Sequence, residues 1–117
     1  MTNYDRDAER AAREWLALAD VADGAGTWAA AASLFRDAVP AAEWARSLDA
    51  ARAPLGSVVD RTLRSAHAVS ELPGAPDGEY VVLEFDTQFE RKRTAVETVT
   101  PMRDRDGSWR VSGYYIR

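Results

Sequence analysis

The chain has 117 residues, of which 46% are hydrophobic and 29% are charged, and this composition predicts one globular domain over residues 1–117. A net charge of −4 argues against nucleic-acid or anionic-membrane partners, because both require a concentrated positive field. The absence of cysteine excludes disulfides, thiolate catalysis and cysteine-ligated zinc, and a single histidine provides little for any other metal site. We therefore expect no metal and no cofactor.

The compartment is indicated only by two missing signals. No stretch approaches the roughly 18 consecutive apolar residues of a membrane span. The first seven residues lack the basic start and apolar run of a secretory signal. As given, the sequence predicts a cytoplasmic protein, and the alternative is a periplasmic or secreted one from which a signal peptide has been removed.

The first half of the chain predicts three helices. Residues 5–22 carry apolar side chains at steps of three and four, and Gly24 and Gly26 are expected to end this helix. A second helix is expected from an N-cap at Thr27 to about residue 39. A third is expected from Pro40 until Pro54 ends it.

The second half changes to the pattern of strands. Four are expected, over residues 56–72, 79–89, 94–103 and 109–117, separated by turns rich in proline, glycine or charge. Helices followed by strands predict an α+β fold, with three N-terminal helices packed on one face of a curved four-stranded antiparallel sheet.

Both faces of the predicted sheet carry apolar or aromatic residues, whereas the helices can cover only one. We expect Val81, Leu83 and Phe85 to share a core with helical side chains: Trp15, Trp28, Phe35, Trp44 and Leu48. The second face is expected to present a patch that a monomer would not leave exposed, formed by Tyr80, Val82, Val99, Tyr114 and Ile116. This face therefore predicts a homodimer interface, or a pocket for a small apolar ligand.

Several stretches of the chain are similar to a known family. They include EWLALAD (14–20), RAPLGSVVDRTLRSA (52–66), LPGAPDGEYVVLEFDTQF (72–89) and WRVSGYYIR (109–117). In these the chain resembles the bacterial domain-of-unknown-function family 4019. The resemblance implies a small fold similar to the cone-shaped sheet of nuclear-transport-factor-2-like and cystatin-like proteins. It implies no activity, and many members look secreted or periplasmic.

An acid–base site is the alternative to a binding surface. His67 is the only imidazole and so the natural acid–base candidate, although a half-exposed strand histidine is the simpler explanation. Asp86 and Glu97 are expected near Tyr114, and a desolvated carboxylate beside a phenol is suited to proton abstraction. Rim charges and interface hydrogen bonds are the simpler explanation of the same residues.

The sequence thus leads to two hypotheses of different classes. The preferred one is a non-enzymatic binding or interaction module that associates with itself through the exposed sheet face. The alternative is a small cone-pocket enzyme of isomerase or hydratase type. A deep pocket with a buried carboxylate would favour the enzyme, and a flat face covered by a second copy would favour the module.

Overall fold

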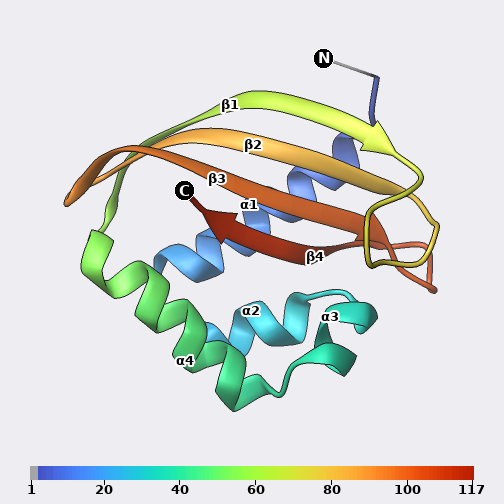
Figure 1. Ribbon diagram of the computed structural model, residues 1–117, viewed down its shortest axis with the longest axis horizontal. Coiled ribbons are helices and arrows are strands. Elements are labelled where there is room, and N and C mark those ends of the chain that lie inside the picture. The colour runs from blue at the N-terminus through green and yellow to red at the C-terminus, as the bar shows by residue number, and fades with distance from the viewer. Residues whose placement is uncertain (1–2) are drawn as a thin grey trace.

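Helices precede strands in the computed structural model, which describes residues 3–117 (Figure 1). In chain order these residues form α1 (Arg6–Asp20), α2 (Gly24–Ala30), α3 (Ser33–Ala38), α4 (Ala41–Arg52), a 3-10 turn (Ala53–Leu55), β1 (Val58–Val69), β2 (Tyr80–Phe89), β3 (Lys92–Arg103) and β4 (Trp109–Ile116). Neighbouring strands are antiparallel and lie in the order β1-β2-β3-β4. The α+β class and the four-stranded antiparallel sheet predicted from the sequence are confirmed.

Helix α1 forms where capping and amphipathic spacing agree. The Asp5 carboxylate accepts a hydrogen bond of 2.9 Å from the backbone N–H of Asp7 and so caps the first turn. One stripe of the helix is buried, and it consists of Ala8, Ala12, Trp15, Leu16 and Ala19. The small alanines allow a close approach to the sheet, and α1 contacts β2, β3 and β4.

The region predicted as a single second helix contains two short ones. Helix α2 starts at Gly24, not near Thr27, because the Asp23 carboxylate accepts a 2.8 Å hydrogen bond from the N–H of Gly26. The expectation that these glycines end a helix was therefore wrong.

Helix α3 is separated from α2 by Ala31 and Ala32, whose ψ angles of 162° and 152° are those of extended backbone. It begins where the Asp104 carboxylate accepts a 2.9 Å hydrogen bond from the N–H of Ser33. This partner lies in the β3–β4 turn, 71 residues away along the chain, so local sequence could not indicate it.

The third predicted helix corresponds to α4, whose last residue is Arg52, two residues before Pro54. Ala53 keeps helical angles of −57° and −42°, and the chain continues as a 3-10 turn through Pro54 to Leu55. Proline disfavours the helical conformation in the residue before it, but this is a preference and not a prohibition. Ala53 adopts helical angles here because it is also the first residue of the 3-10 turn.

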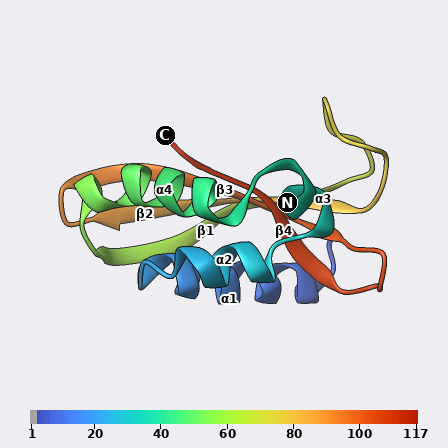
Figure 2. The ribbon, with the colours of Figure 1, turned by 90° about the horizontal axis from the view of Figure 1, so that it is seen from below.

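The helices do not all lie on the sheet. Helix α1 lies behind the curved sheet, whereas α2, α3 and α4 lie below the outer edge of β4 (Figure 1). Seen from below, α1 and α2 run side by side (Figure 2). Helix α4 packs mainly on α2. The side of the sheet that carries α1 is called the helix face below, and the other side is called the open face.

Strand register decides which side chains reach the helix face. Leu83 of β2 is opposite Val99 of β3, and Val99 is opposite Tyr114 of β4, so these three side chains share a face. The core between sheet and helices contains Trp15, Leu16, Leu48, Ala66, Val81, Leu83, Phe85, Val99 and Val111, with Trp44, Trp109 and Tyr114 packed at its border. The predicted core is largely confirmed, but Trp28 and Phe35 lie outside this cluster.

A β-bulge in the last hairpin changes the face assignment of strand β4. Thr100 is opposite Gly113 while Pro101 is opposite Val111, so Ser112 is an extra residue in β4. Pro101 has no N–H to donate to a neighbouring strand, and a proline in an inner strand is found essentially only at such a bulge. The Ser112 hydroxyl donates a 2.8 Å hydrogen bond to the Thr100 carbonyl. The bulge lets Val111 and Tyr114 point to the same side.

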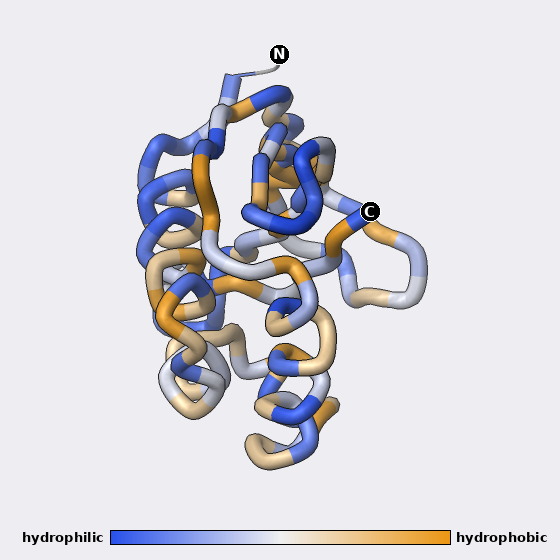
Figure 3. Tube along the Cα trace, turned by 90° about the vertical axis from the view of Figure 1, so that its left-hand side faces the viewer, coloured by the Kyte–Doolittle hydropathy of each residue, from blue (hydrophilic) through white to orange (hydrophobic). Residues whose placement is uncertain are grey.

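Hydrophobic and polar residues alternate in short steps along the chain, without a long hydrophobic segment (Figure 3). Over residues 3–117, none of the helices combines the length and the hydrophobicity that crossing a membrane requires.

Candidate functional site

A carboxylate without solvent exposure lies on the helix face. Glu97, on the inner strand β3, is 0% exposed. Its Oε1 accepts hydrogen bonds from Arg61 Nε at 2.8 Å and from the Thr87 hydroxyl at 2.6 Å, and its Oε2 accepts one from the Tyr114 hydroxyl. A buried carboxylate is tolerated only where donors and an opposite charge replace water. Arg61 and these two hydroxyls meet that requirement.

The contacts of Glu97 continue into a closed ring of five side chains. Arg61 donates to both oxygens of Asp20, at 2.9 Å each, and Arg52 donates to the same carboxylate at 2.8 Å. Arg52 also approaches the Tyr114 hydroxyl at 3.4 Å, which closes the ring. We call Asp20, Arg52, Arg61, Glu97 and Tyr114 the buried ring after its fully buried member Glu97; Asp20 is exposed and lies at the solvent side of the ring. Its two carboxylates and two guanidinium groups balance in charge.

The ring shifts the pKa values of three of its members, Asp20, Tyr114 and Arg61. Burial would raise the pKa of Asp20, but hydrogen bonds from Arg61 and Arg52 outweigh it and hold this pKa below its usual value. Burial, reinforced by the Glu97 charge, raises the pKa of the Tyr114 hydroxyl. Burial opposes the charge of Arg61, yet Asp20 and Glu97 raise its pKa. Asp20 is therefore ionised, and Tyr114 is a neutral donor.

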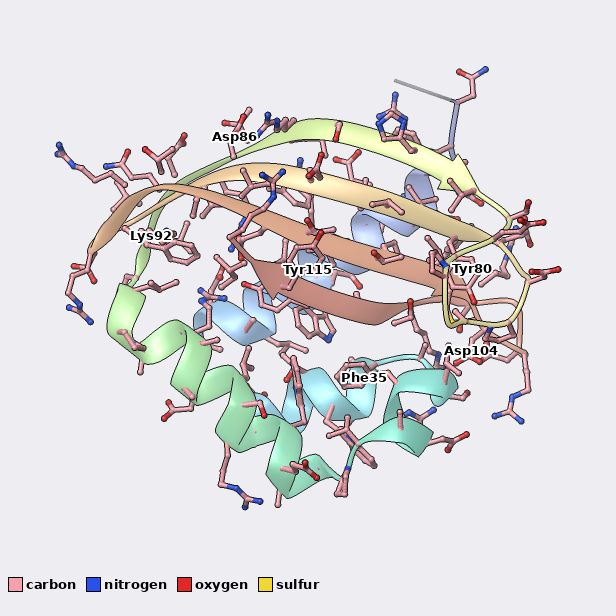
Figure 4. All side chains as sticks on the ribbon, viewed as in Figure 1. Phe35, Tyr80, Asp86, Lys92, Asp104 and Tyr115 are labelled. Atoms are coloured by element: carbon pink, nitrogen blue, oxygen red, sulfur yellow. The ribbon has the colours of Figure 1, made fainter. Side chains whose placement is uncertain are left out.

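An apolar groove separates α4 from the end of strand β4. It has a volume of about 520 Å³ and is lined by Trp44, Ser47, Leu48, Ala51 and Leu55 from α4 and the turn after it, by Tyr114, Tyr115, Ile116 and Arg117, and by Lys92. We call it the α4–β4 groove. Figure 4 shows Tyr115 at β4 and Lys92 at the start of β3. The groove exists because α4 packs on α2 and stands off the sheet.

The α4 wall of the groove is fixed by contacts of Trp44. Its indole N–H donates a 3.0 Å hydrogen bond to the hydroxyl of Thr27, a residue of α2 with 0% exposure. Its ring meets Phe35 edge-on at 4.8 Å and Trp15 at 6.1 Å between centroids. Trp44 is thus held from three sides, so this wall is formed before any ligand arrives.

A second cavity, of about 360 Å³, lies between the C-terminal ends of α1 and α4 and the β2–β3 turn. Asp20 and Arg52 of the buried ring line it, together with residues of both charge signs such as Glu90 and Arg91. Among residues 3–117, the Arg52 Nε has no hydrogen-bond acceptor. The mixed charge of the lining selects no class of ligand. Within the same range, no group of three or more histidine, aspartate or glutamate side chains is placed to hold a metal ion.

The family model described as "Protein of unknown function (DUF4019)" matches residues 11–114. The chain belongs to this family. The range that matches DUF4019 contains all five residues of the buried ring and the α4 wall of the groove. Neither a curated protein nor a solved structure matches the chain.

The DUF4019 chain brings together two of the four residues in the predicted acid–base site. Glu97 and Tyr114 are hydrogen-bonded, as described. Asp86 and His67 are exposed on the open face, where Asp86 approaches Arg64 at 3.5 Å and His67 is opposite Val82. The expected four-residue cluster is therefore absent, because alternation along β1 and β2 places Asp86 and His67 on the side opposite Glu97.

The five residues predicted to share an uncovered face lie on two different faces. Tyr80 and Val82 are on the open face, but Val99, Tyr114 and Ile116 are on the helix face. That expectation was wrong, because the register of β2 with β3 joins Val99 to the core. Tyr80 is only 1% exposed, and its hydroxyl donates a 2.6 Å hydrogen bond to the Pro76 carbonyl of the β1–β2 loop.

Three ring members were not singled out from the sequence, namely Asp20, Arg52 and Arg61. One available signal was Arg61, two positions before Leu63 in β1 and therefore on its face. An arginine and a glutamate on apolar strand faces indicate a buried pair. The positions of Asp20 and Arg52 near helix ends gave no comparable signal.

Proposed function

We propose that this DUF4019 protein is a non-enzymatic binding module and that the α4–β4 groove is its binding site. The observation that carries the proposal is the separation of α4 from β4, which leaves preformed apolar walls around a cavity of about 520 Å³. Pockets of this size, mostly apolar and with a few polar groups, are typical of ligand sites. Lys92 and Arg117 supply the polar groups at one end.

The groove is better suited to binding than the open sheet face. Self-association through the open face was expected from five residues, of which Val99, Tyr114 and Ile116 lie elsewhere and Tyr80 is covered by a loop. The open face is instead rich in polar side chains, among them Thr62, Ser65, His67, Glu84 and Thr100. An exposed face of this kind does not require a partner.

An enzymatic role receives less support from the same geometry. Glu97 accepts from three donors, and one of its oxygens accepts two of those hydrogen bonds. Glu97 is also fully buried, and both of its oxygens are occupied by donors of this chain, so a substrate would have no direct access to the carboxylate. The buried ring therefore acts as a cross-link between β1, β3, β4, α1 and α4.

We further infer a likeness to the nuclear-transport-factor-2-like and cystatin-like folds. What supports it is a curved antiparallel sheet with the long helix α1 along one face. Such a likeness would concern architecture alone, because a shared fold does not imply a shared function.

A fluorescent probe tests the binding site. Anilinonaphthalene sulfonate combines an apolar ring system with one negative charge, which matches apolar walls next to Lys92. We expect saturable binding by the wild type and at least about a tenfold loss in Ala51→Trp, because the indole fills the groove. Ala50→Trp is the matched control, since Ala50 is exposed on α4 but does not line the groove. No saturable binding, or equal binding by both variants, would contradict the proposal.

A further inference from the structure

The outer edge of strand β4 carries free backbone groups beside the groove. Arg117 exchanges two backbone hydrogen bonds of 3.0 Å with Val96 of β3. Pairing in antiparallel strands alternates, so the N–H and C=O groups of Ile116 and Tyr114 point away from β3. Among residues 3–117, no hydrogen bond from a helix, loop or side chain to these four groups is found. They face the side on which α4 stands.

The first half of the same edge is already paired with an extended segment of the chain. The N–H of Ala32, in the extended link between α2 and α3, donates a 2.8 Å hydrogen bond to the carbonyl of Val111. Helix α3 also contacts β4. The N-terminal half of the β4 edge thus already pairs with extended backbone of the same chain. The C-terminal half of this edge, at Tyr114 and Ile116, has no such backbone partner among residues 3–117.

The opposite edge of the sheet is protected by different means. Strand β1 pairs with β2 through two irregularities, between Val58 and Asp60 and between Leu63 and Ser65. It also exposes the charges of Asp60 and Arg64. Bulges and charges of this kind prevent an edge from pairing with another chain. The contrast makes residues 114–116 the stretch of edge best prepared to accept a strand.

Side-chain chemistry defines what an added strand would carry. Residues opposite Tyr114 and Ile116 would point to the same face as these two, into the space lined by Trp44 and Leu48. Apolar side chains at alternate positions fit there. The groove ends at Lys92, whose ammonium has no ion-pair partner among residues 3–117. A carboxylate at that end of the strand would complement its charge.

We propose that the α4–β4 groove binds an extended segment of a partner protein as a fifth, antiparallel strand on β4. The segment has apolar residues at alternate positions and an acidic side chain toward its N-terminus, where it meets Lys92. Backbone hydrogen bonds to Tyr114 and Ile116 hold the strand, and α4 covers its apolar side. This inference rests on the proposed function and names the occupant of the same groove.

A second copy of this chain is the less suitable occupant. A stable dimer buries roughly 800 Å² on each partner. The free edge is short, and the groove beside it is bounded by the chain's own α4, so an entering β4 would have to bring its own α4 alongside. One extended segment can enter this space without that obstacle.

The test uses the peptide acetyl-Glu-Ser-Val-Ser-Leu-Ser-amide and the intact protein, with binding measured by titration of the ¹⁵N-labelled chain. In the proposed pairing the valine faces Ile116 and the leucine faces Tyr114. N-methylation of the valine removes an N–H that points at β4 and should weaken binding about tenfold or more. N-methylation of the serine between them alters an N–H that points away and should change binding less than about twofold. Equal effects of the two N-methyl groups would overturn the strand geometry.

Charge reversal tests the orientation. Lys92→Glu should weaken binding of the acidic peptide about two- to fivefold, the range for a solvent-accessible ion pair, and a peptide with lysine in place of glutamate should regain that loss. Arg93→Glu changes the net charge equally at an exposed residue outside the groove and should have no effect. If the two variants respond alike, the acidic contact at Lys92 is refuted.

The outcomes separate this inference from the proposed function. Binding of anilinonaphthalene sulfonate that depends on Ala51, without peptide binding, retains the groove as a ligand site and overturns the strand. If neither anilinonaphthalene sulfonate nor the peptide binds, both the groove as a ligand site and the added strand are overturned. Concentration-dependent dimerisation that is abolished by Ala51→Trp, with no response to the peptide, identifies a second copy as the occupant and also overturns the proposal.

Discussion

Replacing Glu97 by glutamine removes one charge from the buried ring while preserving the shape of the side chain. In the variant the amide oxygen can still accept from Arg61 and Thr87, and the Tyr114 hydroxyl can rotate to accept from the amide N–H. The change is therefore mainly electrostatic. Two guanidinium groups would remain with only the Asp20 carboxylate.

The expected cost follows from the burial of the pair. Glu97 is fully buried, and the Arg61 side chain is only 13% exposed, so solvent does little to screen the unpaired charge. Removing one partner of a buried ion pair costs about 3–5 kcal/mol of unfolding free energy. For a chain of this size, that corresponds to a fall of about 10–25 °C in Tm.

Urea unfolding followed by tryptophan fluorescence measures the effect. Glu84→Gln is the matched control, because it makes the same chemical change on the open face, where Glu84 pairs with the largely exposed Arg117. The control should lose at most about 1 kcal/mol. If Glu97→Gln were no less stable than Glu84→Gln, the buried ring would not stabilise the fold, and the energetic reasoning above would be wrong.

Three further predictions concern pH and helix capping. The pKa of Asp20 is lower in the folded protein than its unfolded value of about 3.9. The ionised Asp20 therefore contributes stability above about pH 4, and this contribution is lost as the pH falls further. Urea unfolding should show a smaller acid-induced loss of stability in Asp20→Asn than in the wild type. The pKa of Tyr114 is raised on folding, so stability should decrease as the pH rises above about 10, and less so in Tyr114→Phe. Asp104→Ala removes the cap from Ser33 and should cost about 1–2 kcal/mol, with faster amide hydrogen exchange in α3.

The strands could be predicted from sequence because their signals are local. Alternation in β2 gave the correct inward set, Val81, Leu83 and Phe85, and glycine- or charge-rich turns marked the strand ends. The number of helices could not be predicted in the same way. Helix α3 depends on a carboxylate from the β3–β4 turn, and a cap supplied by a distant residue leaves no periodic pattern.

The site was predicted less well because it depends on register between strands. Glu97 and Tyr114 were expected to be neighbours, and they are. Their placement on an uncovered face was wrong, because the register of β2 with β3 puts Glu97 opposite Phe85, on the core side. The bulge in the last hairpin was not expected either. Pro101 was the overlooked signal, since a proline within an inner strand indicates a bulge.

Deletion of Ser112 tests the assignment of this bulge directly. Ser112 is the extra residue, so without it Val111 and Gly113 would be consecutive and could keep their partners Pro101 and Thr100. Tyr114 and Ile116 would then also keep their partners and their face. The deletion removes the hydrogen bond from the Ser112 hydroxyl to the Thr100 carbonyl, so we expect a loss of about 0.5–1.5 kcal/mol, with the near-ultraviolet circular dichroism of the packed aromatics retained. Deletion of Asp77, in the exposed β1–β2 loop, controls for chain shortening. A loss of more than about 4 kcal/mol, together with loss of that circular dichroism, would show that residues on one side of the deletion change face and that Ser112 is not the extra residue.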